Sequence, residues 1–129
     1  EEQMRVVKHT HNGSIVAEGT DLPDPISDAG AALDVIASAQ HSTGTNRVVF
    51  HREALDDSFF DLSSGLAGEI LQKVSNYGLQ LAIVGDFSQV TGGALLDFIR
   101  ESNEYGQVMF LPDVQAAVER MGADGRSRT

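Results

Sequence analysis

Short apolar runs alternate with amphipathic stretches along most of this chain. Strand-like segments over 4–11 and 14–18 flank Asn12-Gly13, a pair that readily adopts the positive φ angles of a tight hairpin turn. Three later runs have the length and the β-branched or aromatic content of buried strands: 47–50, 79–84 and 108–111. The pattern therefore predicts an opening hairpin followed by three further strands.

The stretches between these runs carry apolar residues at helical spacing and predict four helices. The clearest is the last, with an apolar stripe typical of a helix that lies on a sheet: Val114, Ala117, Val118 and Met121. Ser27 is predicted to cap the first helix and Asp113 the last, because short polar side chains satisfy free amides there. A glycine is predicted to end each helix: Gly44, Gly78, Gly106 and Gly122.

Strands that alternate with helices over short connections favour a largely parallel sheet with right-handed crossovers. The hairpin adds one antiparallel edge. With 129 residues, of which 41% are apolar, the chain is long enough for one core. We predict a single α/β domain over 4–122, with a mixed, mostly parallel sheet of about five strands, an N-terminal hairpin and about four helices. A disordered tail is predicted over 123–129.

Charge and composition narrow the classes of partner. The formal net charge is −10, which repels phosphate backbones and anionic membrane surfaces and argues against nucleic acid as a partner. Cysteine is absent, so disulfides, thiolate nucleophiles and cysteine metal sites are excluded. The chain shows no basic-then-apolar leader and no apolar run of ~20 residues, so we expect a cytoplasmic protein outside the membrane.

The segment Asp61-Leu62-Ser63-Ser64-Gly65 is similar to a motif of a known fold. Together with the predicted order of hairpin, strands and helices, it resembles the STAS domain of bacterial anti-sigma-factor antagonists over nearly the whole chain. In that family an Asp-Ser-Ser-Gly-Leu segment ends a strand and opens a helix, and a partner kinase phosphorylates a serine there. The resemblance implies a STAS-like fold and a phosphoserine at Ser63 or Ser64.

A second set of motifs is more specific: Phe59-Phe60-Asp61-Leu62, 65–73, Asn76-Tyr77, 81–87 and 98–103. These motifs resemble the signature of the bacterial DUF4180 family, whose members are short standalone proteins of unknown function. The resemblance implies the fold and leaves the mechanism open.

The serine pair carries the sharpest chemical hypothesis. Ser63, Ser64 and Gly65 are predicted at a helix start, where unpaired amides and the positive end of the helix dipole favour an anion or a phosphoserine. The alternative is that Asp61 or a serine simply caps the helix.

The helix that follows is predicted to present a polar band to solvent: Glu69, Gln72, Lys73 and Asn76. Tyr77 and an exposed Phe87 would add aromatic surface, the component most often enriched where proteins bind one another. An ordinary solvated face is the competing interpretation.

Two other interpretations involve histidines. His51, Ser64 and Asp86 fall near carboxyl ends of predicted strands, where open α/β sheets collect ligands. The hydrolase elbow, the P-loop lysine and the dinucleotide fingerprint are all absent. His9 and His11 lie two apart on one strand and could chelate a metal, but a solvent-facing edge strand also explains them.

We therefore predict a non-catalytic regulatory or protein-interaction module, in one version switched by phosphoserine, with a protein partner, no cofactor and no metal. Its predicted contact residues are Asp61, Ser63, Ser64, Gly65, Glu69, Gln72, Lys73, Asn76, Tyr77, Asp86 and Phe87. The alternative is a small-molecule or anion-binding domain, or an enzyme, that uses a pocket near Ser64, His51 and Asp86. Homodimerisation through an edge strand or the last helix stays open.

Overall fold

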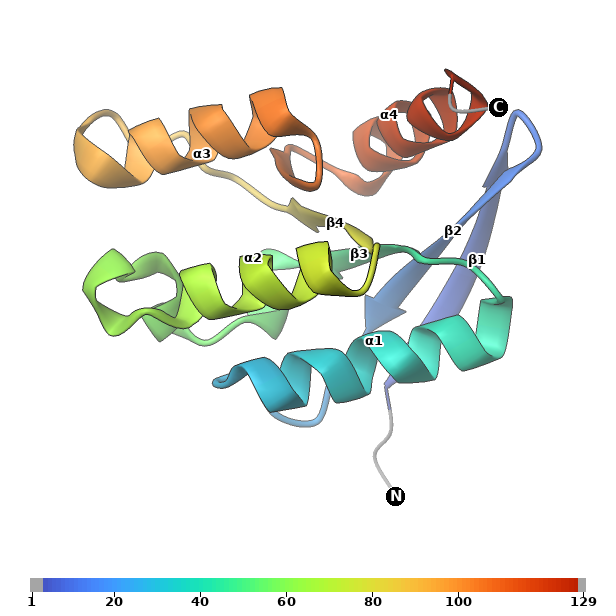
Figure 1. Cartoon of the computed structure of the whole chain (residues 1–129), viewed down its shortest axis with the longest axis horizontal. Helices are drawn as coiled ribbons and strands as arrows, with labels where there is room; N and C mark the ends of the chain where they lie inside the picture. Colours follow the sequence, from blue (N-terminus) through green and yellow to red (C-terminus); the bar gives the residue numbers. More distant parts are fainter. Residues whose placement is uncertain (1–3, 128–129) are drawn as a thin grey trace.

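A five-stranded sheet forms the centre of the molecule in the computed structural model, which describes residues 4–127 and, as side chains, residues 4–122 (Figure 1). The strands lie in sequence order: β1 (Arg5–His11), β2 (Ser14–Thr20), β3 (Arg47–His51), β4 (Gln80–Val84) and β5 (Val108–Leu111). Strand β1 is antiparallel to β2, and β2 to β5 are parallel.

The predicted hairpin is confirmed in its turn and its register. Asn12 and Gly13 have φ angles of 52° and 83°, as a tight two-residue turn between twisted strands requires. This turn pairs His11 with Ser14 and His9 with Val16. Alternate residues of the two strands therefore lie on the same face of the sheet.

Four helices within the described residues cover the sheet: α1 (Ala29–Thr43), α2 (Leu66–Asn76), α3 (Gly93–Tyr105) and α4 (Val114–Ser127). Helices α1, α2 and α3 lie on one face because successive parallel strands are joined by crossovers of one hand. Helix α4 covers the other face, mainly over β1 and β2. The predicted α/β class, the mixed sheet and the number of helices are confirmed.

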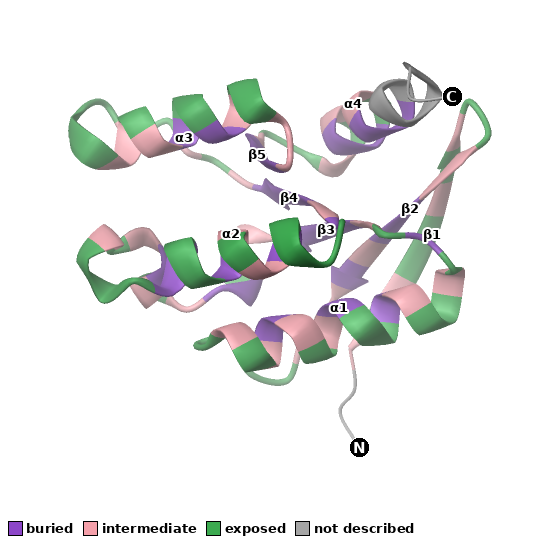
Figure 2. Ribbon diagram, in the orientation of Figure 1, coloured by how far each residue is buried: buried purple, intermediate pink, exposed green. Residues whose placement is uncertain are grey.

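The alternation of side chains along each strand divides the core into two layers. Val48, Phe50 and Ile83 face α1, α2 and α3, whereas Val49 and Met109 face α4. Figure 2 shows the buried residues along the strands and on the inward sides of the helices. Strands β3 and β4 are buried almost throughout, as the continuous apolar runs predict.

Two of the predicted helix caps can be compared with the structure. Asp28, one residue after the predicted Ser27, caps α1 by accepting a 2.7 Å hydrogen bond from the amide of Ala31. Asp113 caps α4 as predicted, with the amide of Ala116 donating over 2.8 Å. A carboxylate at the cap also favours the positive end of the helix dipole.

Gly122 does not end α4, which continues to Ser127. Gly122 is buried, and a Cβ atom there would lie 2.8 Å from Cδ2 of His11. This glycine therefore allows α4 to approach the end of β1 closely. The helix extends into the segment predicted as a tail, 123–129, of which residues 128–129 lie outside the described residues.

The connection from β3 to α2 differs from the resemblance-based expectation that the serine motif ends a strand. After His51 the chain forms three short 3₁₀ helices before α2 begins: η1 (Arg52–Ala54), η2 (Asp57–Phe60) and η3 (Leu62–Ser64). The motif 61–65 therefore lies at the end of this connection rather than at the end of β3.

Candidate functional site

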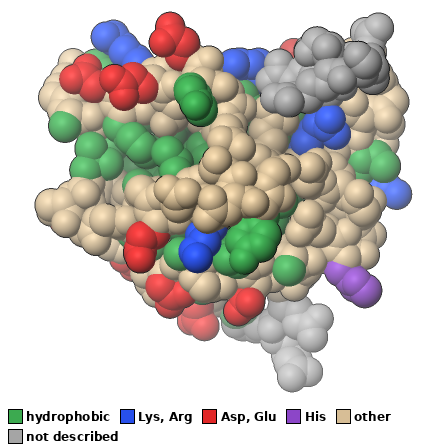
Figure 3. All heavy atoms as spheres, in the orientation of Figure 1, with side chains coloured by type: hydrophobic (Ala, Val, Ile, Leu, Met, Phe, Trp, Pro, Cys, Tyr) green, Lys and Arg blue, Asp and Glu red, His purple; other side chains and the backbone are tan. Residues whose placement is uncertain are grey.

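A largely apolar groove lies between α2 and α3 (Figure 3). Its volume is about 420 Å³. We define the α2–α3 groove by the residues that line it: Gly68, Leu71, Gln72, Ser75, Phe98, Glu101, Ser102, Tyr105, Gln107 and Val108. Figure 3 shows hydrophobic side chains gathered in a hollow between the two helices.

The groove exists because α2 packs against only one of its two neighbours. Helix α2 packs along α1 but makes only sparse contact with α3. Gly68 and Ser75 of α2 and Ser102 of α3 line the gap, and these small residues leave it unfilled. Leu71 and Phe98 are therefore only partly buried, although both belong to the edge of the main core.

An aromatic cluster joins η2, the loop after β4, α3 and β5. Its centre is Phe110 of β5, whose ring centroid lies 5.5 Å from that of Phe87 and 5.8 Å from that of Phe98. Phe60 adds an edge contact to the same ring at 6.5 Å. Phe87 is half-buried in this cluster, so the prediction that it is exposed is wrong; its ring packs on Phe110 instead of facing solvent.

Acidic side chains border the groove. Glu101 lines it directly, and Asp97 and Glu104 are exposed on the same helix, α3. Arg100 is the exposed cation of α3, so the described side chains of this helix carry more negative than positive charge. The local charge agrees with the net charge of the whole chain, −10.

The predicted polar band on α2 adjoins this groove. Glu69, Gln72 and Asn76 are exposed, and the side-chain amide of Gln72 donates a 3.0 Å hydrogen bond to Oδ1 of Asn76. Lys73 is only half-exposed, whereas Tyr77 at the end of the helix is 63% exposed. Of the predicted band, Gln72 alone lines the groove.

The corner at 61–65 is exposed, but its amides are not free. The amide of Ser63 donates to Oδ1 of Asp61 over 3.1 Å, and the amide of Ser64 donates to the carbonyl of Asp61. The amide of Gly65 donates to the carbonyl of Leu62. The predicted set of unpaired amides at residues 63–65 is therefore wrong, because the local turn uses them. Asp61 caps the short helix η3 rather than α2, whose N-cap is Gly65, without a side-chain cap. The hydroxyl oxygen of Ser64 accepts from the amide of Leu66 in the first turn of α2, over 3.2 Å.

Both serine hydroxyls of this corner also have partners. The hydroxyl of Ser63 donates to Oδ1 of Asp61 over 2.6 Å, and that of Ser64 donates to the carbonyl of Ser58 over 2.6 Å. Both serines are exposed to solvent.

The sequence of this chain matches one protein family. The model of a family described as a domain of unknown function, DUF4180, matches residues 11–121. The chain belongs to the DUF4180 family. The match spans every strand from β2 to β5 and all residues of the α2–α3 groove in this DUF4180 domain. No curated protein and no solved structure matches the chain.

The predicted pocket of Ser64, His51 and Asp86 does not gather these side chains in the DUF4180 domain. Each has a different partner: Ser64 bonds to Ser58, His51 to Glu18, and Asp86 accepts from the amide of Ser88 over 2.9 Å. Hydrogen bonds from the side chain and the amide of Ser88 hold the pKa of Asp86 below its ordinary value.

The sequence analysis did not predict a cluster of His9, Glu18 and His51. These side chains lie on the same face of the sheet as α4. Nε2 of His9 lies 2.8 Å from Oε1 of Glu18, and Nε2 of His51 lies 2.6 Å from Oε2. The Glu18 side chain is 13% exposed. Burial by itself raises the pKa of Glu18, but the hydrogen bonds from His51 and His9 outweigh it and hold this pKa below its ordinary value.

The cluster is not arranged as a metal site. Each imidazole points at a different oxygen of one carboxylate. Among the side chains that the structure describes, no group of three His, Cys, Asp or Glu is placed to hold a metal ion. Within the same described part of the chain, no helix is long and apolar enough to cross a membrane.

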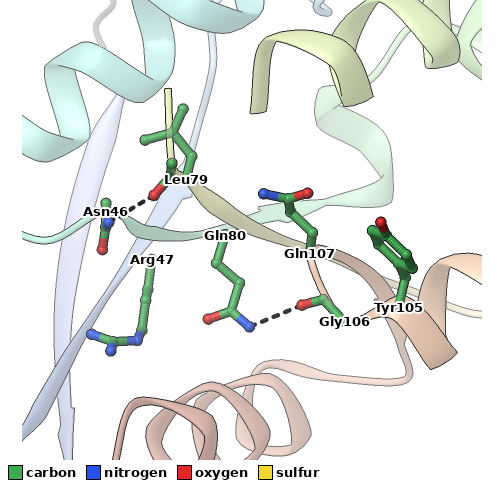
Figure 4. Close-up of a pocket in the computed structure, with 8 residues that line it drawn as sticks. Asn46, Arg47, Leu79, Gln80, Tyr105, Gly106 and Gln107 are labelled. Atoms are coloured by element: carbon green, nitrogen blue, oxygen red, sulfur yellow. Dashed lines mark hydrogen bonds between the residues drawn. The ribbon is translucent and has the colours of Figure 1, made fainter. Parts of the chain in front are cut away.

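Another hollow, which is polar, lies at the amino ends of β3, β4 and β5 (Figure 4). The side-chain amide of Asn46 donates to the carbonyl of Gly78 over 2.8 Å, and that of Gln80 donates to the carbonyl of Gly106 over 2.9 Å. Both carbonyls belong to glycines that follow helices. These amides therefore hold two loops in place, and the hollow has a structural explanation.

Proposed function

We propose that this protein is a non-catalytic regulatory module that binds an amphipathic, basic helix of a partner protein in the α2–α3 groove. The observation that carries the proposal is the open, apolar gap between two helices that lie on one face of the sheet. Monomeric proteins seldom leave such apolar surface uncovered unless something binds there.

The shape of the groove favours a helix as the occupant. Its walls are two helices, and its floor includes Val108 of β5. An amphipathic helix buries its apolar side chains in such a groove at positions i, i+3, i+4 and i+7. Leu71 and Phe98 would provide the apolar contacts, and Gln72 and Tyr105 lie at positions where polar rim contacts are expected.

The charge around the groove favours a basic partner. Glu101 lines the groove, and Asp97 and Glu104 follow the same helix outside it. Basic residues on the polar face of a partner helix would approach these carboxylates. Complementary charge of this kind raises association rates and discriminates against acidic partners more than it raises affinity.

The predicted STAS-like fold and the serine pair support a regulatory version of this function. A phosphate on Ser63 would replace the hydroxyl that donates to Asp61 and would place two negative groups side by side. We infer that phosphorylation would open the corner that precedes α2. Mass spectrometry of protein from its native cell should find phosphate on Ser63 or Ser64. Unmodified serines under all growth conditions would contradict regulation by phosphorylation.

A peptide-binding assay tests the proposed function. The probe is a fluorescein-labelled helical peptide of about five turns, with leucine on one face and lysine on the other. A control peptide carries glutamate in place of lysine. Fluorescence anisotropy should show saturable binding of the lysine peptide and at least about tenfold weaker binding of the glutamate peptide.

Two matched variants locate the binding. Ser75→Trp places a large side chain in the groove, whereas Ser38→Trp makes the same change on the exposed face of α1. We expect Ser75→Trp to abolish peptide binding and Ser38→Trp to retain it. Equal binding by both variants, or by both peptides, would contradict the proposal.

A further inference from the structure

A second pocket lies at the carboxyl ends of β2 and β3, apart from the α2–α3 groove. Its volume is about 400 Å³, within the range of small-molecule sites. The residues that define this His51 pocket include Thr20, Asp21, Leu22, His51, Glu53 and Ala54. The carboxyl ends of parallel strands are the edge at which open α/β sheets bind ligands.

Backbone hydrogen bonds fix the walls of the His51 pocket. The amide of Ile26 donates to the carbonyl of Ala54 over 2.7 Å, and the amide of Asp56 donates to the carbonyl of Ile26 over 2.9 Å. These two bonds join the segment after β2 to the segment after β3 as a short parallel bridge. The walls are therefore preformed, which lowers the entropy lost when a ligand binds.

The Glu18 carboxylate orients His51. Nε2 of His51 lies 2.6 Å from Oε2 of Glu18, so this nitrogen carries the proton and donates. This bond fixes the orientation of the His51 ring at the edge of the pocket. His9 holds the other carboxylate oxygen at 2.8 Å and prevents Glu18 from turning away.

Three ionisable residues line the pocket: Asp21 and Glu53 contribute carboxylates, which are acceptors, and the third is His51. Arg5 is the nearest cation in a described ion pair, 3.9 Å from Asp21, but both side chains are exposed and such pairs contribute little. Arg52 bonds to Asp57 and stacks on Phe60 at 4.0 Å from its ring centroid.

We propose that the His51 pocket binds a small organic cation, an ammonium group on an apolar body. The ammonium group would donate to the carboxylates of Glu53 and Asp21 beside His51, and the apolar body would lie on Leu22 and Ala54. An ammonium group only donates, so it matches a pocket whose charged groups include two carboxylates.

Nuclear magnetic resonance of the ¹⁵N-labelled full chain tests this proposal with three probes of one shape. Phenethylamine carries the ammonium group, phenethyl alcohol is neutral, and hydrocinnamate is an anion. Amide signals of 20–22 and 53–54 should shift saturably with phenethylamine. The alcohol should bind about tenfold more weakly, and the anion should give no saturable shift.

Variants distinguish binding in the His51 pocket from non-specific attraction of a cation to an acidic protein. Glu53→Gln and His51→Gln should each weaken phenethylamine binding at least about threefold, whereas Glu104→Gln and His41→Gln, exposed elsewhere, should leave it unchanged. Glu53 is exposed, so its variant tests the site even where His51→Gln disturbs the cluster. Equal binding of amine and alcohol, shifts spread over the surface, or unchanged binding in Glu53→Gln would overturn the proposal.

Discussion

Helix α2 lies between α1 and α3 on the same face of the sheet, and it packs closely against α1 but not against α3. Toward α1 the gap is closed, and the buried residues Ile36 of α1 and Ile70 of α2 belong to one continuous core. Toward α3 the gap is open, with Gly68 and Ser102 on its walls and Leu71 only partly buried. The strands follow one another in sequence order on both sides, and all three helices lie on one face of the sheet.

This difference shows that the α2–α3 groove is a property of the side chains rather than a requirement of the fold. Larger residues in place of Gly68, Ser75 or Ser102 would close it, as the α1 side is closed. A domain that needed only stability would gain from the closed arrangement on both sides. The open side is therefore where the proposed partner helix would bind.

The largest expected effect is on the free energy of unfolding, and it distinguishes residues of α2 buried in the core from residues that face the α2–α3 groove. Ile70→Ala should lower the free energy of unfolding by about 2–5 kcal/mol, because Ile70 is 1% exposed and its truncation leaves a cavity. Leu71→Ala should cost at most about 1 kcal/mol, because Leu71 already faces open space. Urea denaturation measures both, and similar losses in the two variants would show that the groove is closed in solution.

The next effect concerns stability on the opposite face of the sheet, and it serves as a control for the groove variants. Glu18→Gln should destabilise the protein at neutral pH by about 1–3 kcal/mol, because it removes a charged acceptor from two imidazoles. The pKa of Glu18 is lowered in the fold, so its contribution is complete above the ordinary value of 4.5 and is lost as pH falls through the folded-state pKa.

The difference between Glu18→Gln and the parent protein should therefore shrink in acid. Denaturation curves between pH 3 and pH 7 measure this difference, and a gap that widens in acid would contradict the sign. Binding of the lysine peptide should be the same in Glu18→Gln and in the parent protein at neutral pH, because the groove lies on the other face.

A smaller effect comes from closing the groove. Ser75→Leu should raise the free energy of unfolding by about 0.5–1 kcal/mol, because the added side chain buries apolar area against the open wall. The same variant should lose peptide binding. A destabilised variant that still binds the peptide would show that Ser75 lies outside the contact surface.

The smallest effect concerns the charge at the rim. Glu101→Lys should weaken binding of the lysine peptide by about three- to fivefold at low salt, and the loss should fade as salt screens the charges. Asp34→Lys makes the same charge change on the exposed side of α1 and should have less effect. Anisotropy titrations at two salt concentrations compare them.

Local sequence signals predict most of the fold. The Asn12-Gly13 turn sets the hairpin, and the strand predicted over 108–111 agrees with β5 residue for residue. Gly106 ends α3 with a φ angle of 84°, as a glycine after a helix should. Gly122 misled the prediction because the same residue type also permits close approach, and only the position of His11 shows which role applies.

The sites were harder to predict because they depend on contacts between distant segments. The hairpin register could have placed His9 and Glu18 on one face, but the pairing of β2 with β3 decides that His51 joins them. The groove depends on the small residues that line it on α2 and α3, and apolar periodicity does not show that these two helix faces meet. Leu71 and Phe98 look like ordinary core positions in the sequence.

The most direct test of the α2–α3 groove as the partner site is a map of where a bound helix touches the protein. Amide signals of ¹⁵N-labelled full chain are recorded during titration with the lysine peptide. We predict saturable shifts confined to the facing residues of α2 and α3, including Leu71, Ser75 and Ser102, with α1 signals such as that of Ala37 unchanged. Shifts centred on α1 or α4, or no saturable shift at all, would contradict it.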